Sequence, residues 1–405
     1  MTAATISPEA SQVRSKLPRP FWVLWGGTLI NRVGTMVEPF IGVYLVSMRG
    51  FSLVTAGFVM TLFGAGSLLS QPIAGFLADR IGRKAVLTGG MLATGACLVA
   101  LSMMDSIVGI GVLMLVLGLV LDAYRPASSA LVADLVSPQD RPKAYAFLFW
   151  AVNMGFTAAM LIGGWLAAQK DFAWMFWVDA IACSAFGLMV WFAVPETRGE
   201  AEKASGSYLD VLRDRVMLGF CLILLAYTFV YLQSFTTMSI AMTRQGLPVE
   251  GYGLVMAVNG IVIVVLQPLV AKWLGRFDQS RVLALGMALV GVGFAVKALM
   301  TTVVGYGVAV AVWTLGEVLT AGIAAAIVAG LAPAHLRGRY MGLFGLTWSL
   351  GGLLAPLLGT QILQHANVPT LWVTCGVLAA LGGAGQLLIA PAVRRRALVT
   401  AEAAA

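Results

Sequence analysis

The chain is a succession of apolar runs, each roughly the length of a membrane-spanning helix, separated by short polar connections. The hydrocarbon core of a bilayer is about 30 Å thick, and a helix of roughly 20 apolar residues crosses it. Of the 405 residues, 60% are hydrophobic and 11% are charged, whereas soluble proteins carry roughly 25% charged residues. The runs are rich in Gly and Ala and do not alternate at every second residue, so they predict transmembrane helices and argue against a β-barrel.

We expect twelve transmembrane helices in an all-α membrane protein. The predicted spans are 21–46, 53–77, 85–104, 107–132, 143–168, 172–194, 216–239, 250–272, 281–302, 304–330, 339–363 and 368–392. The longest polar interval separates the first six spans from the last six. The predicted organisation is an N-terminal tail (1–20), a six-helix bundle (21–194), a linker (195–215), a second six-helix bundle (216–392) and a C-terminal tail (393–405). Within the linker, we expect a short amphipathic helix around Tyr208 to Arg215.

The basic residues lie mainly on one side of these spans. With the N-terminus inside, about 20 of the 26 Lys and Arg residues fall in inner connections, and only Arg49, Lys170 and Arg244 fall in outer ones. Cytoplasmic loops carry such an excess, so both termini are predicted to be cytoplasmic in the cell membrane. Charge confined to short loops argues against nucleic-acid binding. We expect membrane lipids as the surroundings and a monomer as the oligomeric state.

The second half of the chain repeats features of the first. The stretch QPIAGFLADRIGRKAVLTGG at 71–90 aligns with QPLVAKWLGRFDQSRVLALG at 267–286, an offset of 196 residues. The same offset relates Arg141 to Arg337. This agreement predicts two pseudo-symmetric halves that arose by duplication. Parallel repeats of this kind place a substrate site between the halves, near the middle of the bilayer.

The connection between the second and third spans carries a charged motif, GFLADRIGRKAVL. It resembles the signature loop of the major facilitator superfamily, G-x-x-x-D-R-x-G-R followed by Lys or Arg. The matching residues are Gly75, Asp79, Arg80, Gly82, Arg83 and Lys84. Gly82 allows a tight turn, and Asp79 is expected to face Arg83 and a helix N-terminus. The resemblance implies alternating access, with Asp79 as a conformational latch against the start of the eleventh helix, around Arg337 to Tyr340.

Charged residues inside the membrane are costly, so each one here is a candidate functional residue. They are Arg32, Glu38, Asp122, Arg125, Asp179, Lys297 and Glu317. On the first helix, Asn31, Thr35 and Glu38 are four and three residues apart and share one face, and that face is expected to line the cavity. Pro39 is expected to kink this helix. An alternative role for Glu38 is an ion pair with Arg32.

The fourth span holds Asp122 and Arg125 three residues apart, where the two charges can neutralise each other, with Pro126 beside them. The segment GLVLDAYRPASSALVADL resembles the fourth-helix arginine motif of the drug:proton antiporter branch of the superfamily. The resemblance implies that Arg125 takes part in proton coupling. A purely structural ion pair is the alternative. The fifth helix matches the antiporter glycine motif only in part, because the proline before Gly163 is missing.

The tenth span contains Glu317 in the stretch WTLGEVL, one turn after Trp313. The stretch resembles an element of the antiporter and peptide-transporter branches in which the glutamate lines the cavity. We expect Glu317 to carry protons or contact substrate, and to face Glu38 from the opposite half; the alternative is an interhelical clamp. Asp179 is expected to anchor helix packing, and Lys297 to extend to the membrane surface.

Polar and aromatic residues on the fifth and seventh helices complete the predicted cavity. They are Trp150, Asn153 and Thr157 on the fifth helix, and Tyr227, Tyr231 and Ser234 on the seventh. Such a lining suits an amphipathic organic ligand, although aromatic residues at helical spacing also serve as packing.

The sequence therefore predicts a proton-coupled exporter of small amphipathic organic molecules or drugs, an antiporter. The alternative is a proton-coupled symporter that imports a small metabolite. The lack of a nucleotide-binding P-loop supports a secondary transporter. An intramembrane enzyme fits less well because the candidate catalytic residues are dispersed across the helices, and a channel fits less well because the sequence has no repeated filter motif. We expect no cofactor and no metal, since the four Cys fall inside predicted spans and the two His in loops.

Overall fold

The computed structural model describes residues 17–137, 139–197, 208–274, 276–333 and 336–402, and the regular elements in them are all helices. The side chains of Gly75, Asp79 and Arg125 lie outside this description. The helices of the first half are α1 (Arg19–Gly34), α2 (Val37–Val43), the π-helical segment η1 (Tyr44–Met48), α3 (Leu53–Ile81), α4 (Arg83–Ser102), α5 (Ile107–Leu121), α6 (Tyr124–Leu135), α7 (Arg141–Ala168) and α8 (Phe172–Ala193). Those that follow are α9 (Tyr208–Leu212), α10 (Arg215–Thr236), α11 (Met238–Arg244), α12 (Val249–Leu274), α13 (Gln279–Lys297), α14 (Val303–Thr320), α15 (Ile323–Leu331), α16 (Arg337–His365) and α17 (Val368–Glu402).

The helices have the length and composition of membrane spans. In the described ranges, eleven helical segments are long and apolar enough to cross a membrane. At the fourth predicted span, 107–132, the structure has a shorter apolar helix, Ile107–Leu121, followed by α6. The prediction of an all-helical, multi-pass membrane protein is confirmed.

Two predicted spans of the first half are interrupted a few residues before a proline. The first span leaves the helical path at Thr35, between α1 and α2, and Pro39 lies four residues later. A proline has no N–H to donate to the carbonyl four residues before it, and its ring clashes with that carbonyl. The kink expected at Pro39 is therefore confirmed. The fourth span is broken at Asp122, four residues before Pro126.

The corresponding spans of the second half are interrupted as well. The seventh span changes from α10 to α11 at Thr237, and the tenth changes from α14 to α15 at Ala321 and Gly322. Gly322 has a φ of 79°, in the left-handed region that glycine adopts without strain.

The repeat is visible in where the helices begin and how they pack. Six helices of the second half begin 196 residues after six helices of the first. In order, α10, α12, α13, α14, α16 and α17 begin at this offset from α1, α3, α4, α5, α7 and α8. The packing recurs too: α1 contacts α7 and α8 as α10 contacts α16 and α17, and α4 contacts α8 as α13 contacts α17. The duplication read from the sequence is thus present in the structure.

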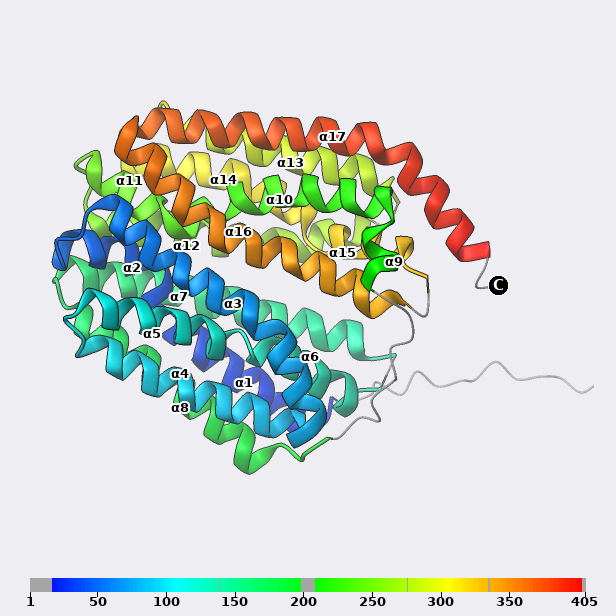
Figure 1. The fold of residues 1–405 in the computed structure, drawn as a ribbon, viewed down its shortest axis with the longest axis horizontal. Helices are drawn as coiled ribbons and strands as arrows, with labels where there is room; N and C mark the ends of the chain where they lie inside the picture. The colour runs from blue at the N-terminus through cyan, green and yellow to red at the C-terminus, as the bar shows by residue number, and fades with distance from the viewer. Residues whose placement is uncertain (1–16, 138, 198–207, 275, 334–335, 403–405) are drawn as a thin grey trace, which may run out of the picture.

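The two sets of helices lie against each other as two layers, with α1 to α8 below and α10 to α17 above in Figure 1. Between the layers, α3 packs on α16 and α7 packs on α12. The end of the molecule away from the C-terminus is closed further by α2 against α10 and α11, where the Ser239 hydroxyl donates to the Pro39 carbonyl at 3.4 Å.

Two segments outside the predicted spans are helical in part. The linker contains the expected short helix, α9. The segment predicted as the C-terminal tail, 393–405, is helical through Glu402, as a continuation of α17. The extension is held by basic side chains: Arg394 Nε lies 3.5 Å from Asp278 Oδ2, and Arg396 Nε lies 3.6 Å from Asp214 Oδ2.

Candidate functional site

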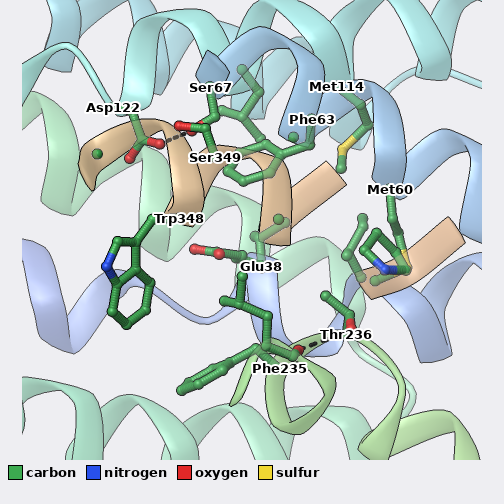
Figure 2. A pocket seen from close by; sticks show the side chains of 18 residues that line it. Glu38, Met60, Phe63, Ser67, Met114, Asp122, Phe235, Thr236, Trp348 and Ser349 are labelled. Carbon is green, nitrogen blue, oxygen red and sulfur yellow. Dashed lines mark hydrogen bonds between the residues drawn. The ribbon is translucent and has the colours of Figure 1, made fainter. Parts of the chain in front are cut away.

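A cavity of about 280 Å³ lies between the two layers. Helices α2, α3 and α5 form its walls on one side, and α10 and α16 form them on the other. Its lining residues are Val37, Glu38, Ile41, Met60, Phe63, Gly64, Ser67, Met114, Leu117, Asp122, Leu232, Phe235, Thr236, Gly345, Trp348, Ser349, Gly352 and Pro356. Figure 2 shows these side chains converging from both layers.

Two carboxylates reach this cavity, both from helix interruptions of the first half. Glu38 lies in the first turn of α2, just after the break in the first span, and Asp122 caps the end of α5. In Figure 2, Glu38 lies near the centre of the lining residues and Asp122 toward one edge. The Ser67 hydroxyl donates a hydrogen bond to Asp122 Oδ2. The broken helices thus bring two acids onto one cavity surface.

The rest of the lining is largely apolar. Phe235 and Trp348 come from the second half, and Met60, Phe63 and Met114 from the first. Such a surface accepts the flat or flexible apolar body of an organic molecule, while the acids offer charge and hydrogen-bond acceptors. The arrangement fits an amphipathic ligand.

Glu317 lies beside the cavity and is not among the residues that line it. The Tyr231 hydroxyl donates to Glu317 Oε1 at 2.9 Å, and Asn259 Nδ2 donates to Oε2 at 2.7 Å. Asn259 also donates to the Thr314 hydroxyl at 3.0 Å. Helices α10 and α12 therefore hold this half-buried carboxyl group of α14, and the groups that bind it are neutral.

Aromatic rings connect Glu317 to the cavity wall. Tyr231 packs edge to face on Trp348, with ring centroids 5.6 Å apart, and on Trp313, at 5.8 Å. Tyr227 stacks on Tyr231 at 6.1 Å. A ligand that displaces Trp348 in the cavity would therefore disturb the tyrosine that binds Glu317.

The comparisons with known proteins agree with this architecture. A family model described as Major Facilitator Superfamily matches residues 24–356 and 246–404. The chain belongs to the major facilitator superfamily. It is therefore a transporter and not an enzyme.

The chain is similar in sequence to relatives of different transporter types and similar in fold to several solved transporters. It is 26% identical to the Na⁺, Li⁺, K⁺/H⁺ antiporter of Planococcus maritimus, over 82% of this chain and 87% of the relative. It is 27% identical to the multidrug resistance protein MdtH of Yersinia enterocolitica, over 79% and 80%. A crystal structure of the peptide transporter POT in complex with sulfate superposes with a TM-score of 0.79 at 17% identity, over 94% of this chain and 96% of that one. A crystal structure of a mutant of the nucleoside transporter NupG superposes with a TM-score of 0.74 at 14% identity, over 92% and 100%.

Several residues expected in the cavity of this facilitator lie elsewhere. Asn31 is buried and donates from Nδ2 to Cys183 Sγ at 3.2 Å and to Met91 Sδ at 3.8 Å, so it packs within the first half. The shared face with Glu38 assumed a continuous helix, and the break at Thr35 removes that premise. The Arg32 guanidinium lies 5.4 Å from the centroid of the Tyr124 ring.

Asn153, Tyr227 and Trp313 were also expected in the cavity, and in this structure they mainly pack within the protein. Asn153 donates to the Phe149 carbonyl of its own helix at 2.9 Å. The Tyr227 hydroxyl is 2.8 Å from the Thr320 hydroxyl. Trp313 is fully buried. None of these three side chains lines the cavity, whereas Phe235 of the seventh predicted span does.

The signature loop of this facilitator forms the tight turn that was expected. Gly82 has a φ of 100°, which favours glycine. The carboxylate of Glu196 accepts from the backbone N–H groups of Lys84 at 3.1 Å and Ala85 at 3.3 Å, so it binds the N-terminus of α4. Asp79, expected near this N-terminus, lies outside the described side chains. Sequence reasoning missed Glu196, which lies in the chain far from the loop.

The basic residues of the loop have partners from other helices or from their own. Arg83 donates to Asp134 of α6. The Lys84 ammonium lies 5.1 Å from the Trp191 ring centroid. Arg80 lies over Phe76 of its own helix at 5.0 Å. The start of the eleventh helix, expected to meet Asp79, has its Tyr340 hydroxyl bonded to Asp214 at 2.8 Å.

Asp179 and Lys297 are the remaining charged residues of the predicted spans whose contacts the structure describes. Asp179 is 5% exposed and accepts hydrogen bonds from the Cys183 thiol and the backbone N–H of Val37. It therefore holds the start of α2 at the break, which agrees with the expected packing role. Lys297 was expected to extend to the membrane surface, and this was wrong: it is fully buried.

Proposed function

We propose that this facilitator exports small amphipathic organic molecules in exchange for protons, as an antiporter. The observation that carries the proposal is the pair of carboxylates, Glu38 and Asp122, on a cavity that is otherwise largely apolar and lies between the two layers of helices. An amphipathic cation fits both the apolar and the acidic parts of this cavity, because its apolar body contacts Trp348 and Phe235 while its charge approaches the acids. A proton that neutralises these acids weakens the attraction, so protons and the cation compete for the same binding energy.

Glu317 is proposed as a further proton carrier. Its carboxyl group binds a phenol and an amide, Tyr231 and Asn259, and both can hydrogen-bond it in either protonation state. No cation lies within 4.0 Å of it among the described residues. The site can therefore gain or lose a proton without breaking an ion pair. Arg125 stays a candidate from the sequence resemblance alone.

The transport cycle proposed is alternating access by two six-helix bundles. In this proposal α5 and α6 together form the fourth of twelve spans, and residues 21–194 and 216–392 are the bundles joined by the linker. The recurring helix starts and the recurring packing support two equivalent halves. The loop residues from Gly75 to Lys84 are proposed as the latch at the end that carries the termini. The Lys and Arg bias supports cytoplasmic termini and a cell-membrane location; a monomer is proposed.

The names of two relatives support antiport and broad substrate range. One is named for exchange of alkali cations with protons and another for multidrug resistance. The solved structures named for peptide and nucleoside transporters share the fold. Their sequence identity to this chain is too low to indicate its substrate.

The direct test uses ethidium, a flat apolar cation, with the purified protein in liposomes whose membrane potential is clamped to zero. An antiporter moves ethidium from the alkaline side into the acidic interior as protons leave. A proton symporter, the alternative, accumulates ethidium only when the interior is alkaline. Accumulation that equals that of protein-free liposomes under both gradients would contradict transport of organic cations.

A further inference from the structure

Lys297 is a fully buried cation in the second half, at the end of α13. Its ammonium lies 3.7 Å from the ring centroid of Phe294, 5.1 Å from that of Trp372 and 5.5 Å from that of Trp313. The ammonium also donates to the Ser234 hydroxyl at 3.3 Å. We call these four residues, Phe294, Trp372, Trp313 and Ser234, the lysine cage. The faces of aromatic rings attract a cation, and so does the C-terminal end of a helix, where Lys297 lies.

The cage contains no counter-ion. Among the described residues no carboxylate lies within 4.0 Å of Lys297, and Glu317 binds Tyr231 and Asn259 instead. The other titratable groups that face the cage are the Cys375 thiol of α17, the Tyr306 phenol, which accepts from Trp372 Nε1 at 3.1 Å, and the Tyr252 phenol, which donates to the Ser234 carbonyl at 3.0 Å. Thiols and phenols ordinarily hold their protons at neutral pH. A charged Lys297 is therefore offset by ring faces and dipoles only.

The cage depends on helices that meet the other half of the protein. Its members come from α10, α13, α14 and α17. Helix α10 continues into α11, and both contact α2 across the interface. The Ser239 hydroxyl of α11 donates to the Pro39 carbonyl, and the Tyr252 ring, whose phenol donates to the Ser234 carbonyl, packs edge to face on Phe40 of α2 with ring centroids 5.2 Å apart. Separation of α2 from α10 and α11 takes Phe40 away from Tyr252, the residue that binds the Ser234 carbonyl. Opening of this end of the molecule therefore opens one side of the cage to water.

We propose that Lys297 is a proton-dependent switch that controls closure of the end of the molecule opposite the termini. With the cage open, water hydrates the ammonium, and the lysine takes its proton from that water. Closure removes this hydration, and the ring faces replace only part of it, so closure is favoured when the proton has returned to water and the amine is neutral. Acid on that side then holds the end open, which is where an exporter of the kind proposed above collects protons. This role rests on the proposed function, and its structural part is tested without substrate.

The test measures the distance between spin labels at Met103 and Leu299 as a function of pH. These positions are 75% and 78% exposed, follow α4 and α13, and are 196 residues apart, so they are equivalent in the two halves. The four native cysteines, all buried, are first replaced by alanine. The measurement is made in the Glu317→Gln background, which removes the proton-binding contribution of that acid. We expect the population with the short distance to grow as the pH rises.

Two substitutions fix the charge of residue 297 in opposite ways. Lys297→Met is neutral at every pH and is expected to give the short distance throughout. Lys297→Arg stays charged at every pH and is expected to give the long distance throughout. An unchanged pH response in either variant, or the same distance in both, would overturn the proposal. Because a denatured protein gives a broad distribution that neither expectation matches, folding is checked by size-exclusion chromatography and by the width of the distances.

Ethidium transport separates this proposal from the one on which it rests. If wild-type protein moves no ethidium while the distances respond as expected, the proposed function fails and the switch stands. If ethidium is exchanged and accumulated by wild type and equally by Lys297→Met at every external pH, the switch fails and the proposed function stands.

Discussion

The Tyr231 hydroxyl donates a 2.9 Å hydrogen bond to Oε1 of Glu317, and the same tyrosine ring packs against Trp348 on the cavity wall. One side chain therefore contacts both a carboxyl group that can carry a proton and a residue that can contact substrate. A change in either place can be transmitted to the other through a single rotation of the tyrosine. This geometry gives the proposed coupling between proton and substrate a defined place in the second half of the protein.

The first prediction concerns Glu317 itself. Glu317→Gln keeps the hydrogen bond from Tyr231 and the side-chain volume, and it removes the ability to release a proton. We expect ethidium accumulation driven by a pH gradient to fall to the level of protein-free liposomes, while exchange of ethidium without a gradient continues. Tyr231→Phe is the matched control: it removes one hydrogen bond to a carboxyl group, worth about 1.5–3 kcal/mol, and is expected to shift the pH optimum without abolishing accumulation. Accumulation at the wild-type level in Glu317→Gln would remove this residue from the coupling.

The second prediction concerns the two acids of the cavity. Glu38→Gln and Asp122→Asn each remove one negative charge from a half-exposed site. Screening by solvent limits the loss to about 1 kcal/mol, or roughly fivefold in ethidium affinity, for each substitution. Phenanthridine, the uncharged parent ring system of ethidium, serves as the control ligand, and its affinity should stay the same. Tryptophan quenching by either ligand provides the measurement, and equal losses for both ligands would mean that the cavity shape, not its charge, has changed.

The apolar runs, the repeat offset and the prolines predict most of the fold, because each acts through local chemistry. The start of each long helix and the kink before Pro39 follow from them. The side-chain partners of the candidate site could not be predicted in the same way. Asn31 and Glu38 do not share a face, because the helix breaks between them. The burial of Lys297 depends on rings from two other helices. Such contacts depend on tertiary packing, which a one-dimensional pattern does not contain.

The third prediction concerns the close packing of α3 on α5. A Cβ at Gly66 would lie 1.9 Å from the carbonyl oxygen of Leu115, which belongs to backbone and cannot rotate away. Gly66→Ala is therefore expected to lower stability by about 1–3 kcal/mol, the usual range for overpacking. A Cβ at Gly89, also within a helix, would meet nothing within 4 Å. Gly89→Ala is the matched control and should leave the melting temperature unchanged or slightly higher. Equal melting temperatures for the two variants in detergent would contradict the packing described for α3 and α5.

The last prediction uses a difference between the two halves at equivalent positions. The N-cap of α13 is Asp278, whose carboxylate accepts from the Arg281 N–H at 2.9 Å, and the position 196 residues earlier is Gly82. Gly82 provides the turn but has no side chain to cap α4, so Glu196, beyond the end of α8, does this instead.

Because Glu196 joins two segments that are distant in the chain, its loss has a wider effect than the loss of a local cap. Both Glu196→Ala and Asp278→Ala should cost about 1 kcal/mol of stability. Only Glu196→Ala is expected to speed hydrogen exchange both in the first turn of α4 and at the end of α8, since Glu196 joins these two segments, whereas Asp278 joins the start of α13 to Arg394 of α17. Exchange that rises in α4 alone would show that Glu196 acts as a cap and does not hold the two helices together.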